Sequence, residues 1–165
     1  MVAPIWFPRT LGNVQLIIYN SAKALGKEFY KILPHYKEKT ISIIFQLNLT
    51  FGILQRELLG VTNLGGGALK FSRYDIGLFY IIDNFEISTN RFKNFLLRKQ
   101  KSVMEELGLN FSPPIREQEP NPLPDRKAVD DIVFDVLGLT EEERKEVYWA
   151  VAELVKNRLE KAKSV

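Results

Sequence analysis

Several kinds of protein chemistry are excluded by residues that the chain lacks. The 165 residues include no cysteine, so disulfides, iron–sulfur clusters and cysteine-based zinc sites cannot form, and a cytoplasmic location is favoured. His35 is the only histidine, so a transition-metal site would depend on carboxylates alone. A Ser-His-Asp arrangement would have to use this histidine, which follows a proline in a predicted loop. We therefore interpret His35 as a surface residue.

Long apolar runs are also missing. The first ten residues contain two prolines and no apolar stretch of the kind found in a signal peptide. The most apolar helical stretch, Ile41 to Leu59, is interrupted by polar and charged residues that a bilayer core would penalise. They are Gln46, Asn48, Gln55, Arg56 and Glu57. We expect no membrane span.

Charge is distributed unevenly along the chain. Residues 1–112 carry 14 Lys and Arg against 8 Asp and Glu, whereas residues 113–165 carry 9 against 12. The net charge of +3 therefore combines a basic part with an acidic part. The basic part is the better candidate for contact with a polyanion, although a surplus this small is also typical of an ordinary solvated surface.

A proline-rich segment divides the sequence. Residues 112–125 hold five of the eight prolines and few apolar residues. Such a composition predicts an extended, semi-rigid linker. We therefore expect a domain over residues 1–111, a linker over 112–125 and a helical region over 126–165.

The first of these regions predicts strands and one long helix. Short aromatic or aliphatic runs at Ile5–Phe7, Val14–Tyr19 and Phe29–Leu33 are typical of strands. Apolar residues at steps of three and four predict a helix over Ile41–Leu59. Gly77–Ile82 is interpreted as a buried strand or a tightly packed segment. The predicted fold class is α+β, with a mixed or antiparallel sheet packed on the long helix and a helical C-terminal region.

The rest of the chain predicts helices. Thr89–Leu107 is helical in one or two pieces and Arg126–Leu137 in one, and a glycine follows each. A last helix begins after Thr140, where Glu143 completes a capping box, and runs to about Ala162. The polar face of the first of these helices is cationic, and we favour a solvated face over phosphate contact. Its cations are Arg91, Lys93, Arg98, Lys99 and Lys101.

The stretch Leu47–Phe71 is the most informative. A helix runs into three glycines at residues 65–67, and Lys70 and Arg73 follow. Consecutive glycines permit positive φ and the close approach of a ligand, and the two cations favour an anionic ligand. A tight turn with local capping by Asn63 is the alternative. A nucleotide cradle is excluded, because the loop follows a helix instead of a strand and lacks the Gly-Lys-Ser/Thr ending of a P-loop.

Several short sequence words, taken in order, resemble one enzyme family. They are Ala3–Arg9 (APIWFPR), Leu16–Asn20, Gln46–Thr50, Glu57–Gly60, Thr62–Lys70 (TNLGGGALK), Asp125–Phe134, Leu137–Glu143 and Val155–Arg158. Their order and spacing resemble the C-terminal target-recognition region of N6-adenine DNA methyltransferases from type II restriction–modification systems. The ending is similar to that of archaeal members. TNLGGGALK is the most specific of these words.

The resemblance implies recognition of double-stranded DNA without catalysis. The family transfers a methyl group from S-adenosylmethionine with an Asn/Asp-Pro-Pro-aromatic turn and a glycine-containing cofactor loop. Neither is present in working form, because the nearest match, residues 112–115 (SPPI), has Ile115 in place of the aromatic residue. We therefore expect no cofactor and no methyl transfer in this chain. S-adenosylmethionine would bind a catalytic domain outside it.

The resemblance and the charges together give the candidate DNA contacts. Backbone N–H groups of the glycine loop would approach a phosphate, while Asn63 and the cations would add hydrogen bonds and charge. The full set is Asn63, Gly65, Gly66, Gly67, Lys70 and Arg73, with Arg9 and with Arg56 on the polar face of the helix as weaker candidates. No catalytic or metal-binding residue is predicted. Asp130, Asp131 and Asp135 are interpreted as a solvated helix face in preference to a magnesium site.

Two other functions remain open. The aromatic N-terminal part and the last helix are consistent with a protein-interaction module that docks on a separately encoded methyltransferase core or self-associates as a homo-oligomer. A standalone enzyme is a weaker alternative, because the sequence contains no convincing acid, base, nucleophile or metal cluster.

Overall fold

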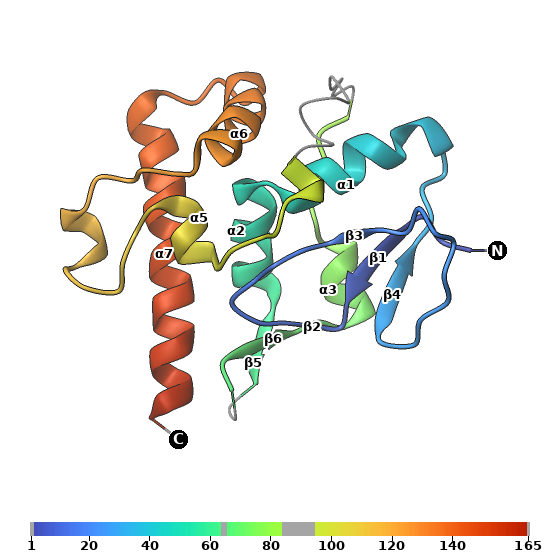
Figure 1. Cartoon of the computed structure of the whole chain (residues 1–165), viewed down its shortest axis with the longest axis horizontal. Coiled ribbons are helices and arrows are strands. Elements are labelled where there is room, and N and C mark those ends of the chain that lie inside the picture. Colours follow the sequence, from blue (N-terminus) through green and yellow to red (C-terminus); the bar gives the residue numbers. More distant parts are fainter. Residues whose placement is uncertain (1, 64–65, 84–94, 165) are drawn as a thin grey trace.

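The chain folds into an α+β structure, as the sequence predicts. The computed structural model describes residues 2–63, 66–83 and 95–164. Two small antiparallel sheets come from the N-terminal part, and helices make up the C-terminal part, where one long helix runs along one side of the molecule (Figure 1).

The first sheet has β1 in its centre. Its strands, in the order β3–β1–β4, are β3 (Ile18–Tyr19), β1 (Ile5–Pro8) and β4 (Phe29–Ile32). Ile5 lies opposite Tyr19 on one side and Ile32 on the other. The strands predicted at Ile5–Phe7 and Phe29–Leu33 are therefore confirmed to within one residue at their ends.

The second sheet joins the N-terminal segment to the glycine loop. Its order is β2 (Thr10–Leu11), β6 (Ala68–Lys70), β5 (Val61–Asn63). Thr10 and Val61 both lie opposite Lys70, one on each side of β6. Strands far apart in the sequence thus place the start of the chain beside the segment that follows the glycine loop.

The strand predicted over Val14–Tyr19 exists only at its end. At Ile17 the pairing group is a side chain: Ile17 N donates to Asn48 Oδ1 at 2.9 Å, and Asn48 Nδ2 donates to the Ile17 carbonyl oxygen at 2.9 Å. One carboxamide thus provides the acceptor and donor that a neighbouring strand would provide. Apolar composition alone did not distinguish these two kinds of partner.

The long helix predicted over Ile41–Leu59 is two helices. α1 (Thr40–Asn48) follows a short 3-10 turn, η1 (Lys37–Lys39), and α2 (Thr50–Leu59) begins after Leu49, which is extended with ψ of 167°. A Cβ on Gly52 would lie 2.5 Å from the Gln46 carbonyl oxygen. Glycine therefore lets α2 start directly against the end of α1.

Two buried arginines satisfy the backbone carbonyls at the end of α1. Arg56 donates to the Leu47 carbonyl oxygen, and Arg126 Nη1 donates to the Asn48 carbonyl oxygen at 2.8 Å. The last carbonyls of a helix have no partner within it and carry partial negative charge, so a cation is favoured there. The break in the predicted helix is therefore stabilised by tertiary contacts.

Asp130 accepts hydrogen bonds from the first residue of α2. Its carboxylate accepts hydrogen bonds from Thr50 N at 2.8 Å and from Thr50 Oγ1 at 2.5 Å. The side chain is 1% exposed, and burial raises its pKa above the ordinary value for aspartate. The prediction of a solvated face is thus wrong for Asp130. Its neighbours Asp131 and Asp135 are less buried and pair with Arg144.

The segment after the second sheet is held by two glutamines. α3 (Arg73–Gly77) begins with a Ser72–Asp75 capping box, and the chain then runs along α1 and α2 without strand pairing. Gln55 bonds to both backbone groups of Tyr80, and Gln46 to both of Ile82, at distances of 2.6–3.2 Å. Gly77–Ile82 is thus anchored through its backbone, but neither predicted alternative describes it fully, because it has no strand pairing and Leu78, Tyr80 and Ile81 are exposed.

The C-terminal helices follow their predicted caps. α5 (Val103–Leu107) ends at Gly108, which has φ of 63°, and residues 89–94 of the helix predicted before it lie outside the described residues. α6 (Pro124–Val136) is followed by Gly138 with φ of 68°. α7 (Glu141–Lys163) begins with the predicted Thr140–Glu143 capping box.

The proline-rich segment packs on the helices around it. It includes the 3-10 turn η2 (Ile115–Glu117), whose first side chain is buried. The Gln118 carbonyl oxygen accepts from Trp149 Nε1 at 2.8 Å, and Leu123 N donates to the Glu106 carbonyl oxygen at 3.0 Å. The segment is therefore a docked connection with tertiary contacts, where the sequence predicted a linker between separate regions.

The hydrophobic core crosses the predicted domain boundary. One cluster combines Phe7 and Ile44 with Val133 of α6, and the other combines Ile53 of α2 with Val151 of α7. Each cluster therefore contains residues from both sides of the proline-rich segment. Among the described helices, none is long and apolar enough to cross a membrane.

Candidate nucleic-acid interface

Gly67, which precedes β6, packs on the last helix. Gly67 has φ of 62°, and a Cβ there would lie 3.0 Å from Leu159 Cδ2 and 3.2 Å from Ala162 Cβ. The Gly67 carbonyl oxygen accepts a hydrogen bond from Arg158 Nη1. Glycine is therefore needed at this position for the approach to α7 and for its left-handed backbone. Gly67 itself is buried and does not present its backbone to a ligand.

The other residues of the loop differ from Gly67. Gly66 is exposed, and a Cβ there would meet no atom within 4 Å. Gly65 and the side chain of Asn63 lie outside the described residues, although the Asn63 backbone pairs with Ala68 in the sheet. Of the three candidate glycines, Gly66 is the one that the structure shows to be open to solvent.

Arg56 was predicted on a polar, solvated face, and this prediction is wrong. Its side chain is 0% exposed. Arg56 Nε donates to Gln15 Oε1 at 2.8 Å, and Nη2 has no hydrogen-bond partner among the described residues. Burial, assisted by the positive charge of Arg126, lowers its pKa to about 9. Arg56 therefore belongs to the interior and cannot contact DNA in this fold.

A buried ion pair fixes the loop and α2 against α7. Arg158 Nη2 and Nε donate to the two carboxylate oxygens of Glu57 at 2.8 and 2.9 Å. Both side chains are nearly inaccessible, at 3% and 1% exposure. Glu57 Oε1 also accepts from Gln15 Nε2 at 2.6 Å. These contacts hold the β5–β6 hairpin in place and so position the residues that follow it.

Lys70 and Arg73 are both exposed at the end of this hairpin. Lys70 is the last residue of β6, where its neighbours Leu69 and Phe71 are buried. The alternation places the Lys70 side chain on the solvent side of the sheet. Arg73 is the first residue of α3. The cations predicted beside the glycine loop are therefore available to solvent, although the loop glycine nearest to them, Gly67, is not.

Arg9 is also exposed, and its backbone lies beside the end of this hairpin. Its carbonyl oxygen accepts from Phe71 N at 3.2 Å, which places it beside the residue between Lys70 and Arg73. Its guanidinium carbon lies 5.0 Å from the centre of the Tyr30 ring, and Tyr30 Oη donates to the Phe71 carbonyl oxygen at 3.0 Å. This stacking orients the Arg9 cation. We call Arg9, Lys70 and Arg73 the cationic surface.

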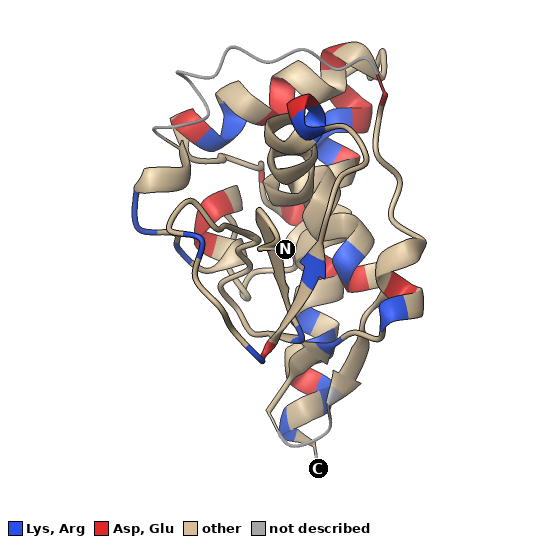
Figure 2. Ribbon diagram, turned by 90° about the vertical axis from the view of Figure 1, so that its right-hand side faces the viewer, with Lys and Arg blue, Asp and Glu red and all other residues tan. Residues whose placement is uncertain are grey.

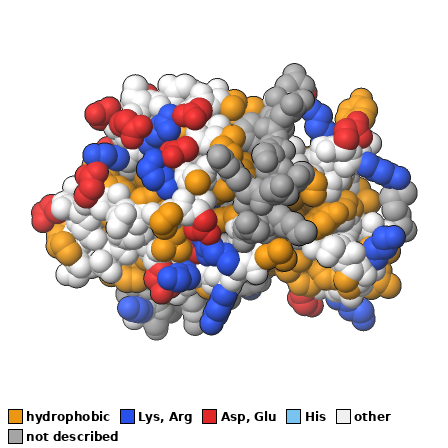
Figure 3. Space-filling model, turned by 45° about the horizontal axis from the view of Figure 1, so that its top comes forward, with side chains coloured by type: hydrophobic (Ala, Val, Ile, Leu, Met, Phe, Trp, Pro, Cys, Tyr) orange, Lys and Arg blue, Asp and Glu red, His pale blue; other side chains and the backbone are white. Residues whose placement is uncertain are grey.

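The cations of this surface differ in their partners from most cations of the C-terminal part. Arg9, Lys70 and Arg73 form no ion pair with any described residue. Acidic and basic side chains are intermixed over the C-terminal helices (Figures 2 and 3). The pairs there include Arg116–Glu146, Arg116–Glu153, Lys127–Asp131, Arg144–Asp135 and Lys145–Glu119. The positive charges of the cationic surface are therefore not neutralised by acidic side chains of the described structure.

Of the other predicted cations, the three within the described residues do not share one solvated helix face. Arg91 and Lys93 lie outside the described residues. Arg98 pairs with Glu106 and Asp125 and is 23% exposed. Lys99 and Lys101 are exposed but lie in the irregular segment before α5. The prediction of a solvated face is therefore wrong for Arg98, which joins α5 to the start of α6.

The near match to a methyltransferase turn does not fit that chemistry. Ile115, at the position where the family has a stacking aromatic residue, is 4% exposed and belongs to the second core cluster. A buried aliphatic side chain cannot stack on a base. Among the described residues, no group of three or more His, Asp or Glu is placed to hold a metal ion. His35 is exposed, as predicted.

Two exposed tyrosines in the segment that follows Lys70 were missed by sequence reasoning. Tyr74 follows Arg73 in α3 and is 75% exposed, and Tyr80 is 79% exposed. The available signal was the position of Tyr74 beside a cation.

Comparisons with family models, with curated proteins and with solved structures found no match to this chain.

Proposed function

We propose that this chain is a non-catalytic target-recognition region of an adenine-specific DNA methyltransferase and that it contacts duplex DNA through Arg9, Lys70 and Arg73. The observation that carries this proposal is the cationic surface, whose three charges are exposed and have no ion-pair partner among the described residues. Exposed cations without protein partners are free to displace counterions from DNA phosphates.

In this proposal the chain binds and positions DNA and takes no part in methyl transfer. Methyl transfer and S-adenosylmethionine binding would belong to a catalytic domain outside this chain. The proposed setting is the cytoplasm, in keeping with the lack of cysteine. Three phosphate contacts give weak, salt-dependent binding, with a dissociation constant on the order of micromolar or higher.

Salt-dependent DNA binding tests this proposal. We expect the double variant Lys70→Ala/Arg73→Ala to bind a labelled duplex more weakly and to lower the slope of log K against log salt by about 2. The measurement is fluorescence anisotropy between about 50 and 200 mM salt. The matched control is Lys127→Ala/Lys145→Ala, which removes the same charge from cations that have acidic partners. Equal losses in the two double variants would attribute binding to net charge and contradict the proposal.

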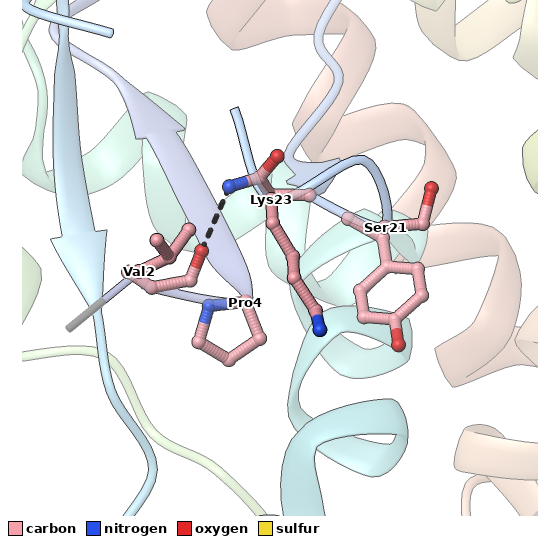
Figure 4. Close-up of a pocket in the computed structure, with 7 residues that line it drawn as sticks. Val2, Pro4, Ser21 and Lys23 are labelled. Atoms are coloured by element: carbon pink, nitrogen blue, oxygen red, sulfur yellow. Dashed lines mark hydrogen bonds between the residues drawn. The ribbon is translucent and has the colours of Figure 1, made fainter. Parts of the chain in front are cut away.

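A protein-interaction module is the second candidate, favoured by an apolar pocket near the N-terminus. The pocket has a volume of about 470 Å³ and includes Val2, Tyr19 and Leu33 in its lining. A neighbouring pocket shares Val2 and Pro4, and the side chain of Lys23 runs between these residues and Ser21 (Figure 4). Light scattering after size exclusion distinguishes self-association from a monomer, and Leu33→Glu should restore the monomer if this surface is the contact.

A further inference from the structure

We propose that Tyr74 and Tyr80 stack on unpaired bases of DNA bound at the cationic surface. This inference rests on the function proposed above and extends it to the form of DNA that binds best. Both rings are among the most exposed large side chains, at 75% and 79%. Exposed aromatic rings beside cations are the combination with which proteins bind unpaired nucleic acid strands, since every base offers a flat face.

The backbone under Tyr80 is fixed, so its ring is held outward. Tyr80 N donates to Gln55 Oε1 at 2.6 Å, and Gln55 Nε2 donates to the Tyr80 carbonyl oxygen at 3.2 Å. Gln55 is buried in α2. A ring that is exposed on an anchored backbone loses little backbone entropy when a base stacks on it.

The two tyrosines belong to the part of the molecule that carries the cations. Phe71 and Phe79 both pack edge-on against Phe7, with ring centres 5.0 and 5.6 Å away. These two contacts bring the segments that contain Lys70 and Tyr80 to the same part of the core. Tyr74 directly follows Arg73 in the short helix between them.

The charge of this region favours a polyanion. Between residues 58 and 82 the only acidic residue is Asp75. Its carboxylate is occupied in the α3 cap, where it accepts from Ser72 N at 2.6 Å. Lys70 and Arg73 are the only cations of this stretch, and Asp83, three residues after Tyr80, pairs with Lys39 at 2.9 Å. These charges favour a partner that combines flat rings with negative charge.

Binding to three DNA probes tests this inference. The probes are labelled oligothymidine, an intact duplex and the same duplex with a central bulge of unpaired thymines, measured by anisotropy with the full chain. The variants are Tyr74→Ala and Tyr80→Ala, each with the phenylalanine substitution that keeps the ring. The control is Tyr36→Ala, which removes a ring that is 67% exposed on the segment before α1. Circular dichroism checks that each variant is folded.

We expect the alanine variants to weaken binding to oligothymidine and to the bulged duplex by about fivefold or more and to leave the intact duplex unchanged. The phenylalanine variants and Tyr36→Ala should bind like the unmodified chain. Alanine variants that bind all three probes unchanged would overturn the stacking inference. If Lys70→Ala/Arg73→Ala then still weakens duplex binding, the proposed function stands without it. If that variant also has no effect, both fail.

Discussion

Gly66 and Gly67 of the glycine loop lie in different surroundings. Gly67 has a left-handed backbone and contacts Leu159 of α7, whereas Gly66 is exposed and a Cβ there would meet no atom within 4 Å. The sequence shows three equivalent glycines and cannot separate them, because φ and the identity of the neighbouring helix come from the tertiary fold. Gly67 is therefore removed from the predicted DNA contacts, whereas the exposed Gly66 remains a candidate.

A pair of alanine substitutions tests this difference. Gly67→Ala should lower the free energy of unfolding by about 1–2 kcal/mol, because an L residue is strained at this φ and its Cβ would crowd α7. Gly66→Ala should change it by less than about 0.5 kcal/mol. Urea unfolding followed by circular dichroism measures both values. Equal effects of the two substitutions would contradict the assignment of Gly67 to the contact with α7.

For the helices, the sequence predicted caps and helical periodicity better than it predicted tertiary contacts. The capping boxes and the glycines after α5 and α6 are local signals, and the structure confirms the capping box of α7. The apolar stripe of Ile41–Leu59 predicted helix correctly but not the break at Leu49, which depends on Arg126 and Asp130 from a segment about eighty residues away. Periodicity shows which face is apolar. It does not show what covers the other face.

Arg56 illustrates the same limit for the candidate site. Its position in the pattern predicted a solvated cation, yet α7 packs on α2 and the side chain is fully buried. Arg9, Lys70 and Arg73 were also predicted as contacts, and they are exposed. Their adjacency depends on the pairing of β2 with β6, which one sequence does not reveal.

The junction of α5 with α6 gives the chain a pH-dependent contact. The Glu106 carboxylate is 2% exposed and accepts from Arg98, from Arg126 Nε at 3.2 Å and from Lys101 N at 2.9 Å. Burial of Glu106 opposes its ionisation, but the hydrogen bonds from Arg98 and the charge of Arg126 outweigh this effect. The pKa of Glu106 is therefore below its ordinary value.

Because the pKa of Glu106 is lowered in the folded chain, its contribution to the free energy of unfolding decreases as the pH falls. Near neutral pH the charged carboxylate contributes fully, and the contribution is lost as pH falls below the ordinary glutamate pKa and through the lowered one. Glu106→Gln should cost about 3 kcal/mol of unfolding free energy at pH 7. The difference from the unmodified chain should shrink below about pH 4. Urea unfolding at several pH values measures this, with exposed Glu160→Gln as control. A pH-independent difference would contradict the assignment.

Contacts among the described residues join the parts of the chain before and after the proline-rich segment, although the sequence predicted a domain boundary there. Both core clusters cross the proline-rich segment, and the Glu57–Arg158 ion pair joins residues that are 101 positions apart. Proline content predicted an extended chain here, but it carries no information on whether that chain docks. Docking depends on the fit of Ile115 and Gln118 against α7.

The two tryptophans provide separate probes of the two parts. Trp6 lies in β1 and is 9% exposed, and Trp149 lies in α7, where its Nε1 donates to Gln118. Because the cores are shared, we expect Trp6→Phe to report the unfolding of the C-terminal part and Trp149→Phe to report that of the N-terminal part. Within each variant, tryptophan fluorescence and circular dichroism should give coincident urea transitions, as a single cooperative unit requires. A fluorescence midpoint that departs from the circular dichroism midpoint in either variant would show two independently folding domains. The proline-rich segment would then be a linker, and the buried ion pair would be a contact between domains.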